Sequence, residues 1–290
     1  MSKFRRRMKS VSQRLAASVL LALISVAGCG NGRVVLPFTI DPNAVASPHD
    51  SSQLATNEGA IRGIASILVR GLQLPMPSTF TAYVYSGRHG FERGLIDDAH
   101  VSPIRAAELS EFAVGIGKRR QLLLNDEGGT ARGREWFRLI AHELAHVSQI
   151  ELAHGEGRAE QWLAEGMAEW TAFNVLERLG LDTVVNRRSV AIAGIRNHAA
   201  LVAARLDLET LGHPRGFTVR HLREGSLPTY QLAFLMADYL IARDGFPRVV
   251  AYFASFQRRP DRHANFRATF GQSLEQFEQE VLAHLKSAVR

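Results

Sequence analysis

The residues of this sequence best suited to chemistry are two histidines and a glutamate in Ala141–Ile150, AHELAHVSQI. His142 and His146 are four positions apart, so a helix places them on the same face. Two neutral imidazoles at this spacing suit a tetrahedral zinc ion. Glu143 follows the first histidine and could reach a water molecule bound to such an ion, as a metal-assisted hydrolase with a carboxylate base requires. The alternative is a buried amphipathic helix that carries two polar histidines.

A second motif, WLAEGMAEW, follows at Trp162–Trp170. Residues 147 to 164 separate His146 from Glu165, a gap of 18 residues. A zinc site with two histidines needs a third protein ligand, which a carboxylate on the next helix can supply. The HELAH segment, the gap and WLAEGMAE together resemble the gluzincin superfamily of zinc metallopeptidases, the peptidase MA-like domains. The second phrase is similar to WLNEGFAE of the membrane alanyl aminopeptidase branch, and its Gly166 leaves space for a facing helix or substrate.

The resemblance implies a role for each residue of the two motifs. One zinc ion is expected to be bound by His142, His146 and Glu165, with Glu143 as the catalytic base. Glu169 lies one helical turn after Glu165, so both carboxylates can face the histidines. Gluzincins carry at this position a carboxylate that accepts the ring N–H of a ligand histidine, here expected to be His142. The alternative for Glu169 is a solvated helix residue.

Tyr230 is the candidate for stabilising the oxyanion of the reaction. It lies in TYQLAFLM, which resembles the tyrosine-led segment that supplies this donor in the alanyl aminopeptidase branch. Leu232 and Ala233 replace the Lys-Gly that usually follows that tyrosine, and a core tyrosine is the alternative. The sequence also lacks a Gly-x-Met-Glu-Asn segment, which anchors the free amine of the substrate in those aminopeptidases. Aminopeptidase specificity is therefore not expected, and an endopeptidase or a narrowly specific processing enzyme fits equally well.

The segment Gln121–Asn125, QLLLN, predicts a short strand just before the HExxH helix. In gluzincins an edge strand of the amino-terminal sheet runs beside the metal and pairs with extended substrate. The resemblance thus implies that Leu122, Leu123 and Leu124 bind a peptide or protein substrate through backbone hydrogen bonds. The alternative is an ordinary internal strand.

The charge of the chain is concentrated at its start. The formal net charge is +7, and no acidic residue precedes residue 30. This basicity belongs to a targeting segment, so the sequence does not predict nucleic acid as a partner. The six early positive charges are Lys3, Arg5, Arg6, Arg7, Lys9 and Arg14.

The first 29 residues have the form of a bacterial secretory signal. The apolar run Leu15–Ala27 is short for a transmembrane helix and leads into Val26–Cys29, which resembles a lipobox. The resemblance implies cleavage before Cys29, lipidation of its sulfur and anchoring to a lipid membrane. Gly30 rather than Asp follows, which favours the outer membrane of the bacterial cell envelope, facing the periplasm. The alternative is an ordinary signal peptide, and a single cysteine excludes an intramolecular disulfide.

Three regions are expected along the chain. Residues 1–28 form the lipoprotein signal peptide, and residues 29–57, which are rich in proline, glycine and serine, form a flexible tether after the lipidated cysteine. Residues 58–290 form the peptidase MA-like catalytic domain. Within it, Thr79–Tyr85 reads as a strand, and helical periodicity dominates after residue 132.

The expected fold class is α+β, with a small amino-terminal lobe built on a short sheet, followed by a mainly helical lobe. The resemblance specifies a gluzincin or thermolysin-like metallopeptidase fold, with zinc in the cleft between the lobes. The expected function is zinc-dependent hydrolysis of peptide bonds by a membrane-anchored enzyme. The alternative is a catalytically inactive, lipid-anchored scaffold or peptide-binding protein with the same fold.

Overall fold

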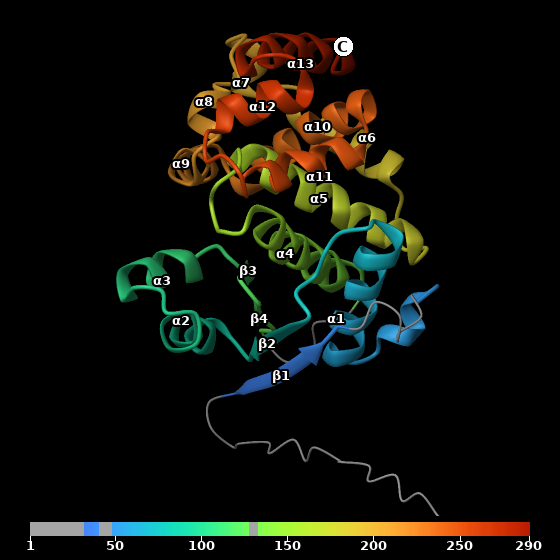
Figure 1. Ribbon diagram of the computed structural model, residues 1–290, viewed down its shortest axis with the longest axis vertical. Coiled ribbons are helices and arrows are strands. Elements are labelled where there is room, and N and C mark those ends of the chain that lie inside the picture. The colour runs from blue at the N-terminus through green and yellow to red at the C-terminus, as the bar shows by residue number, and fades with distance from the viewer. Residues whose placement is uncertain (1–31, 41–47, 128–132) are drawn as a thin grey trace, which may run out of the picture.

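The computed structural model describes residues 32–40, 48–127 and 133–290 (Figure 1). Cys29, the predicted site of lipidation, lies outside these residues. These described residues are mixed α+β, 64% helical, with a small four-stranded sheet. All described strands precede residue 126, and only helices follow residue 133, which confirms the predicted α+β class and its order of elements.

The sheet forms one end of the molecule and has the strand order β1-β2-β4-β3. β2 and β4 are parallel, whereas β1 pairs with β2, and β3 with β4, in antiparallel fashion. β4 therefore has a neighbour on each side, and β3 lies at the edge. The strands are β1 (Arg33–Thr39), β2 (Thr79–Tyr85), β3 (Gly115–Lys118) and β4 (Gln121–Asn125).

Strand β1 corrects the prediction that residues 29–57 form a flexible tether. Residues 33–39 of that region pair with all seven residues of β2. Phe38 is buried and stacks on Phe80, with ring centroids 4.9 Å apart. Pro37 is compatible with this pairing because β1 is an edge strand, where a missing N–H can face away from the sheet. The short helix η1 (Ser51–Leu54) then packs the buried side chain of Leu54 into the main core.

Helices cover both faces of the sheet. On one face, Leu122 and Leu124 join the main core with α1 (Asn57–Ser66), which the short π-helix η2 (Ile67–Gly71) continues. On the other face, Leu123 joins a smaller core with α2 (Arg88–Asp97) and α3 (Pro103–Ser110). A central strand that is buried on both faces reads as a continuous apolar run, which explains the three consecutive leucines of β4.

The helical part is built on three long helices, of which α5 packs against α4 and also against α10. α4 lies between the sheet part and the remaining helices (Figure 1). Nearly every side chain of α10 from Leu232 to Ile241 is buried, as its apolar sequence predicts. The helices are α4 (Arg134–Ala153), α5 (Gln161–Arg178), α6 (Val184–Ile195), α7 (Ala199–Val202), α8 (Leu208–Leu211), α9 (Pro214–Glu224), α10 (Ser226–Asp244), α11 (Phe246–Ser255), α12 (Arg262–Phe270) and α13 (Leu274–Ala288).

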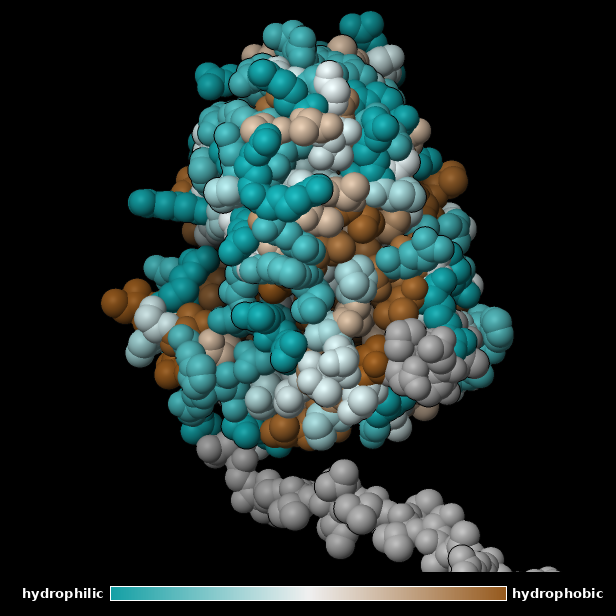
Figure 2. All heavy atoms as spheres, in the orientation of Figure 1, coloured by the Kyte–Doolittle hydropathy of each residue, from teal (hydrophilic) through white to brown (hydrophobic). Residues whose placement is uncertain are grey.

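The surface is mostly hydrophilic on the face shown in Figure 2, with apolar groups gathered at mid-height. Among the described residues, no helix combines the length and the apolar character needed to span a membrane.

Candidate metal centre

The two motifs meet because α4 and α5 pack along each other. α4 carries His142, Glu143 and His146 on its buried side, and α5 carries Glu165 and Glu169. All of these side chains are buried except that of His146, which is half-buried.

Close packing at this point requires the glycine that follows Glu165. A Cβ atom on Gly166 would lie 2.2 Å from the carbonyl oxygen of Ala233 in α10. Real Cβ contacts are never this short, so a larger residue would push α10 away from α5. Gly166 thus leaves space for a facing helix, as the sequence predicts, and α10 is that helix.

Three ligand-type atoms converge between the helices. The distance between His142 Nε2 and His146 Nε2 is 3.1 Å, and Glu165 Oε2 lies 3.3 Å and 3.4 Å from these two atoms, respectively. Ligand atoms that bind zinc at about 2.0–2.1 Å in a tetrahedron lie about 3.3 Å apart, so this triangle has the size of a tetrahedral face. His142, His146 and Glu165 therefore form a buried group that could hold a metal ion.

The contacts behind the imidazole rings fit the same interpretation. His146 Nδ1 lies 2.9 Å from Gln149 Oε1, and His142 Nδ1 lies 3.2 Å from Glu169 Oε1. Because these oxygens are acceptors, a neutral ring at either position would carry its proton on Nδ1 and would turn the lone pair of Nε2 toward Glu165. Glu165 Oε2 is buried and has no hydrogen-bond partner among the described residues. Three converging lone pairs repel one another unless a cation lies between them, so the residues fit a metal ion.

The electrostatics of these residues show how strongly the space between them favours positive charge. Burial opposes the charged form of His142, but Glu165 and Glu169 outweigh this effect and raise the pKa of His142 to about 10. Burial likewise opposes ionisation of Glu165, but His146 and His142 hold its pKa well below the ordinary value. A proton on the histidines here takes the place of the positive charge that a metal ion would supply.

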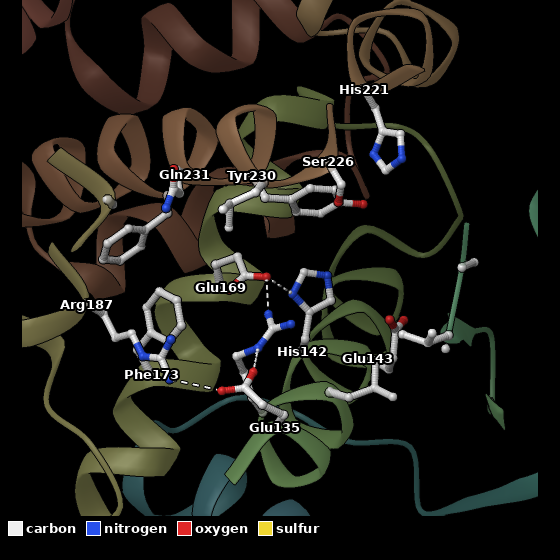
Figure 3. Close-up of a pocket in the computed structure, with 18 of the residues that line it drawn as sticks. Glu135, His142, Glu143, Glu169, Phe173, Arg187, His221, Ser226, Tyr230 and Gln231 are labelled. Carbon is white, nitrogen blue, oxygen red and sulfur yellow. Dashed lines mark hydrogen bonds and ion pairs between the residues drawn. The ribbon is translucent and has the colours of Figure 1, made fainter. Parts of the chain in front are cut away.

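Glu169 is oriented from both sides. Its Oε1 lies 3.2 Å from His142 Nδ1 and accepts a hydrogen bond of 2.6 Å from Arg138 Nη1 (Figure 3). Arg138 also donates from Nε to Glu135 Oε2 at 3.0 Å. Burial opposes ionisation of Glu169, yet His142 and Arg138 lower its pKa to about 2. Glu169 is therefore a buried carboxylate that contacts a histidine of the metal-binding group and not a solvated helix residue.

Gln149 is a site residue that the motifs did not reveal. In addition to its contact with His146, its Nε2 donates to the carbonyl oxygen of Ala164 at 2.9 Å, which fixes the side chain between α4 and α5. The available signal is its position three residues after His146, on the same face of α4. Polar residues at this spacing from a metal-binding histidine are candidates for orienting its ring.

Glu143 lies next to the metal-binding group and faces strand β3. Its Oε2 accepts a hydrogen bond of 2.8 Å from the backbone N–H of Gly117. Strand and helix approach closely because β3 contains two glycines: a Cβ on Gly117 would lie 2.2 Å from the carbonyl oxygen of Glu143, and one on Gly115 would lie 2.8 Å from its Cγ.

The prediction that Gln121–Asn125 is the edge strand beside the metal is wrong. This segment is β4, which pairs with β2 on one side and β3 on the other. Leu122, Leu123 and Leu124 are fully buried in the cores on the two faces of the sheet. Their backbone groups and side chains are not available to a substrate, and β3 takes the edge position beside α4.

Tyr230 lies in the first turns of α10, across the cavity from His142 (Figure 3). The centroids of the two rings are 6.0 Å apart, and the ring of His221 in α9 packs edge-on at 5.8 Å. Burial, and then the charges of Glu165 and Glu143, raise the pKa of Tyr230 well above its ordinary value. Its hydroxyl therefore stays protonated and can donate a hydrogen bond. His221 was not singled out from the sequence, and its packing against Tyr230 is evident only in the folded structure.

Two cavities flank the metal-binding group. The first, here called the α6-side cavity, has a volume of 360 Å³ and reaches Val190 and Ala191 of α6. The second, here called the α3-side cavity, has a volume of 510 Å³ and reaches Arg105 and Leu109 of α3. Both cavities share the central part of the site, so together they form one cleft that passes the metal-binding group. The shared residues are Phe112, Ala113, Gly115, His142, Glu143, His221 and Tyr230.

Comparisons of the chain with protein-family models, with curated proteins and with solved structures find no match. Its function is therefore argued from the geometry of the site.

Proposed function

We propose that the chain is a zinc-dependent metallopeptidase of the gluzincin type. The observation that carries the proposal is the convergence of His142, His146 and Glu165 around a position that Glu143 also borders. A metal-binding group alone would serve a structural site equally well. A structural site has no use for a buried carboxylate beside the ligands, nor for a cleft that reaches them.

Zinc is the metal that this ligand set favours. Two imidazole nitrogens and one carboxylate oxygen leave the fourth tetrahedral position open, which is the arrangement of catalytic zinc sites. When bound, the ion would lower the pKa of a coordinated water and polarise the carbonyl group of a substrate. Glu169 and Gln149 would fix the orientation of the two histidine rings.

Glu143 is proposed to act as the base. Its carboxylate accepts the proton of the attacking water and then passes this proton to the leaving amine of the cleaved peptide bond. The hydrogen bond from Gly117 N–H fixes the orientation of this carboxylate.

Tyr230 is proposed to donate its hydroxyl proton in a hydrogen bond to the developing oxyanion of the substrate. Its position opposite His142 and its raised pKa support this role, because the donor must remain protonated.

The substrate is proposed to be an extended peptide that pairs with β3. This strand is at the edge of the sheet and runs against α4 beside Glu143. Backbone pairing at a sheet edge provides affinity with little dependence on the substrate sequence. We therefore assign to β3 the peptide-binding role that the resemblance implied for β4. Anchoring through Cys29 remains a proposal that rests on the lipobox-like Val26–Cys29 alone.

The proposal is tested by digesting casein with the full chain in detergent, before and after treatment with a zinc chelator. The expected result is cleavage that the chelator abolishes and that one equivalent of zinc restores. A zinc-loaded protein that cleaves nothing would contradict the proposal and would favour the inactive scaffold. Cleavage that is insensitive to the chelator would exclude the proposed metal-dependent mechanism.

A further inference from the structure

Strand β1 is an apolar strand at the outer edge of the sheet, with the sequence RVVLPFT. Among the described residues, no strand pairs with the edge of β1 that faces away from β2. Burial falls toward its start: Phe38 is buried and Leu36 is half-buried, whereas Val34 and Val35 are 52% and 42% exposed. An exposed apolar edge strand invites unwanted pairing unless something covers it. Within the described part of the chain, the start of β1 is left largely uncovered.

The only charge of β1 is neutralised by a neighbouring side chain. Arg33 Nη1 donates to both carboxylate oxygens of Asp98, at 2.9 Å and 3.0 Å. The guanidinium group also lies 5.6 Å from the ring centroid of Tyr83. A charge that is paired and packed in this way is less costly to bring beside an apolar phase than a free charge. The start of β1 therefore presents two apolar side chains, and the positive charge next to them is balanced.

The lipid anchor proposed at Cys29 is close in sequence to this end of β1. Only residues 30–32 separate Cys29 from Arg33. Even when fully extended, this stretch of chain spans at most about 14 Å. The polar layer on each side of a bilayer is about 5–8 Å thick. Acyl chains inserted into the bilayer would therefore keep the start of β1 at the membrane surface, whereas the sequence predicted a tether that extends to residue 57.

The backbone of β1 limits how deeply this end of the domain can enter a membrane. The N–H and C=O groups along its open edge have no partner strand among the described residues. Hydrocarbon cannot satisfy such groups, so an open sheet edge is excluded from the bilayer core. At the level of the headgroups, water and lipid oxygens can satisfy them, and apolar side chains can still reach the acyl boundary. The strand therefore fits the headgroup layer.

We propose that the start of β1 rests on the lipid surface of the membrane, with Val34 and Val35 at the boundary between headgroups and acyl chains. The inference rests on the proposed anchoring through Cys29 and adds the face of the domain that meets the membrane. β1 lies at the sheet end of the molecule, opposite α7 and α13 (Figure 1). The helical part therefore points away from the bilayer, and the cleft beside α4 keeps a fixed orientation relative to the lipid surface.

The first test uses the lipidated full chain in vesicles of phosphatidylethanolamine and phosphatidylglycerol. Cys29 is the only cysteine and lipidation blocks its sulfur, so an introduced cysteine alone takes an environment-sensitive fluorophore. Val34→Cys reports on the proposed contact, and Val202→Cys, at a residue of α7 that is 79% exposed, is the matched control. The label at residue 34 should emit at shorter wavelength and be quenched by lipids brominated near the headgroup, more than by lipids brominated at the chain end. The label at residue 202 should show neither effect.

Mass spectrometry of the amino-terminal peptide separates failure of this inference from failure of the anchor. A lipidated Cys29, together with a label at residue 34 that behaves like the label at residue 202, would overturn the inference and leave the anchor standing. An unmodified Cys29 in protein taken from cells would overturn both. Shielding of the label that grows with protein concentration, without quenching by brominated lipid, would show that a second copy covers β1 and would also overturn the inference.

The second test changes the apolar contact itself, with the fluorophore kept at residue 34. Val35→Asp places a carboxylate at the acyl boundary, which is unfavourable, so quenching should fall to the level seen for the label at residue 202. Val35→Ile keeps an apolar, β-branched side chain and should retain the quenching. The urea unfolding midpoints of the two variants control for damage to β1. Equal quenching in Val35→Asp and Val35→Ile would overturn the inference.

Discussion

Glu165 and Glu169 lie on one face of α5, yet their carboxylates touch different atoms. Glu165 Oε2 faces the Nε2 atoms of both histidines, whereas Glu169 Oε1 faces Nδ1 of His142. Helical spacing alone predicts that both can approach the histidines. The 18-residue gap and the resemblance of WLAEGMAE distinguish the expected ligand from the supporting residue. Because the two carboxylates contact different atoms, their substitution should affect zinc binding to different extents.

The first prediction compares Glu165→Ala with Glu169→Ala. Glu165→Ala removes a direct ligand and should abolish most zinc affinity. Glu169→Ala removes a carboxylate that orients His142, so zinc should still bind, with an affinity about 10–100-fold lower. Isothermal titration of both metal-free variants with zinc measures this. Loss of zinc in Glu169→Ala together with retention in Glu165→Ala would show that the assignment is reversed.

The second prediction concerns Gln149, whose role was not evident from the sequence. Gln149→Leu removes the acceptor for His146 Nδ1 and should weaken zinc binding by about tenfold or more. Gln149→Glu keeps an oxygen acceptor at the same place and should retain most of the affinity. Zinc titration of the two variants is the measurement, with unfolding by urea as a control for damage to α4. Equal affinities of Gln149→Leu and wild type would show that Gln149 does not orient the histidine.

At the scale of elements, the sequence predicts the helices better than the sheet. The helical periodicity predicted after residue 132 matches the observed run of helices that begins with α4, because these helices bury apolar faces. Strand β3 has the sequence GIGK, in which Ile116 is the only β-branched residue and two glycines weaken the local indication of a strand. The two glycines of β3 allow the strand to lie close to α4, and they do not favour the strand conformation itself. The need for small residues here is evident only from the folded structure.

Strands β1 and β4 show two further limits of local patterns. The prolines near β1 indicate a tether, but an edge strand tolerates Pro37, and only the pairing with β2 reveals it. The three leucines of β4 indicate a strand without telling which neighbours it has. A continuous apolar run is typical of a strand buried on both faces, as β4 is in the structure.

The third prediction tests the contact of β3 with α4. Gly117→Ala places a Cβ 2.2 Å from the backbone oxygen of Glu143, so strand and helix must separate and the hydrogen bond to Glu143 should break. We expect a loss of about 1–3 kcal/mol in the free energy of unfolding and a large loss of peptide cleavage. Zinc should still bind, because the three ligands lie on α4 and α5.

Gly115→Ala is the matched control on the same strand. Its Cβ would meet only side-chain atoms, at 2.8 Å from Glu143 Cγ and 3.0 Å from Leu139 Cδ1, and these can move. The effect on the free energy of unfolding should therefore be smaller than for Gly117→Ala. Urea unfolding and zinc titration measure both variants, and equal stabilities of Gly117→Ala and wild type would refute the close contact.

On the scale of the whole molecule, the site depends on contacts between segments far apart in the sequence. The cleft combines β3, α4, α5, α9 and α10, and its α6-side cavity also includes residues of α6. The sequence could predict the metal-binding residues because their spacing is local on two helices. It could not predict the cavities, since Phe112, Phe173 and Phe234 give no sign that they share one wall.

The fourth prediction concerns Glu160, which ties the start of α5 to α12. Its side chain is 0% exposed, and its Oε2 accepts a hydrogen bond of 2.8 Å from Arg262. Burial outweighs the attraction of Arg262 and raises the pKa of Glu160 from 4.5 to about 7. The folded state therefore retains a proton that the unfolded state releases above pH 4.5. This contribution to stability is complete below pH 4.5 and is lost as the pH rises to about 7.

The loss corresponds to about 3 kcal/mol in the free energy of unfolding. Glu160→Gln, which cannot ionise, should lack this decline. The two proteins are compared by urea unfolding at pH 4.5 and pH 8, both with chelator so that the metal plays no part. A constant difference between them at the two pH values would contradict the raised pKa.

The central claim is that Glu143 acts as the base beside a bound zinc ion, and Glu143→Gln tests it most directly. The amide preserves the shape of the side chain but cannot accept the proton of the attacking water. Zinc content and cleavage of an identical peptide are measured side by side for this variant and wild type. The account predicts one zinc ion per chain in both proteins and a rate that is about 10²–10⁴-fold lower in the variant. Full cleavage by the zinc-loaded variant would contradict it.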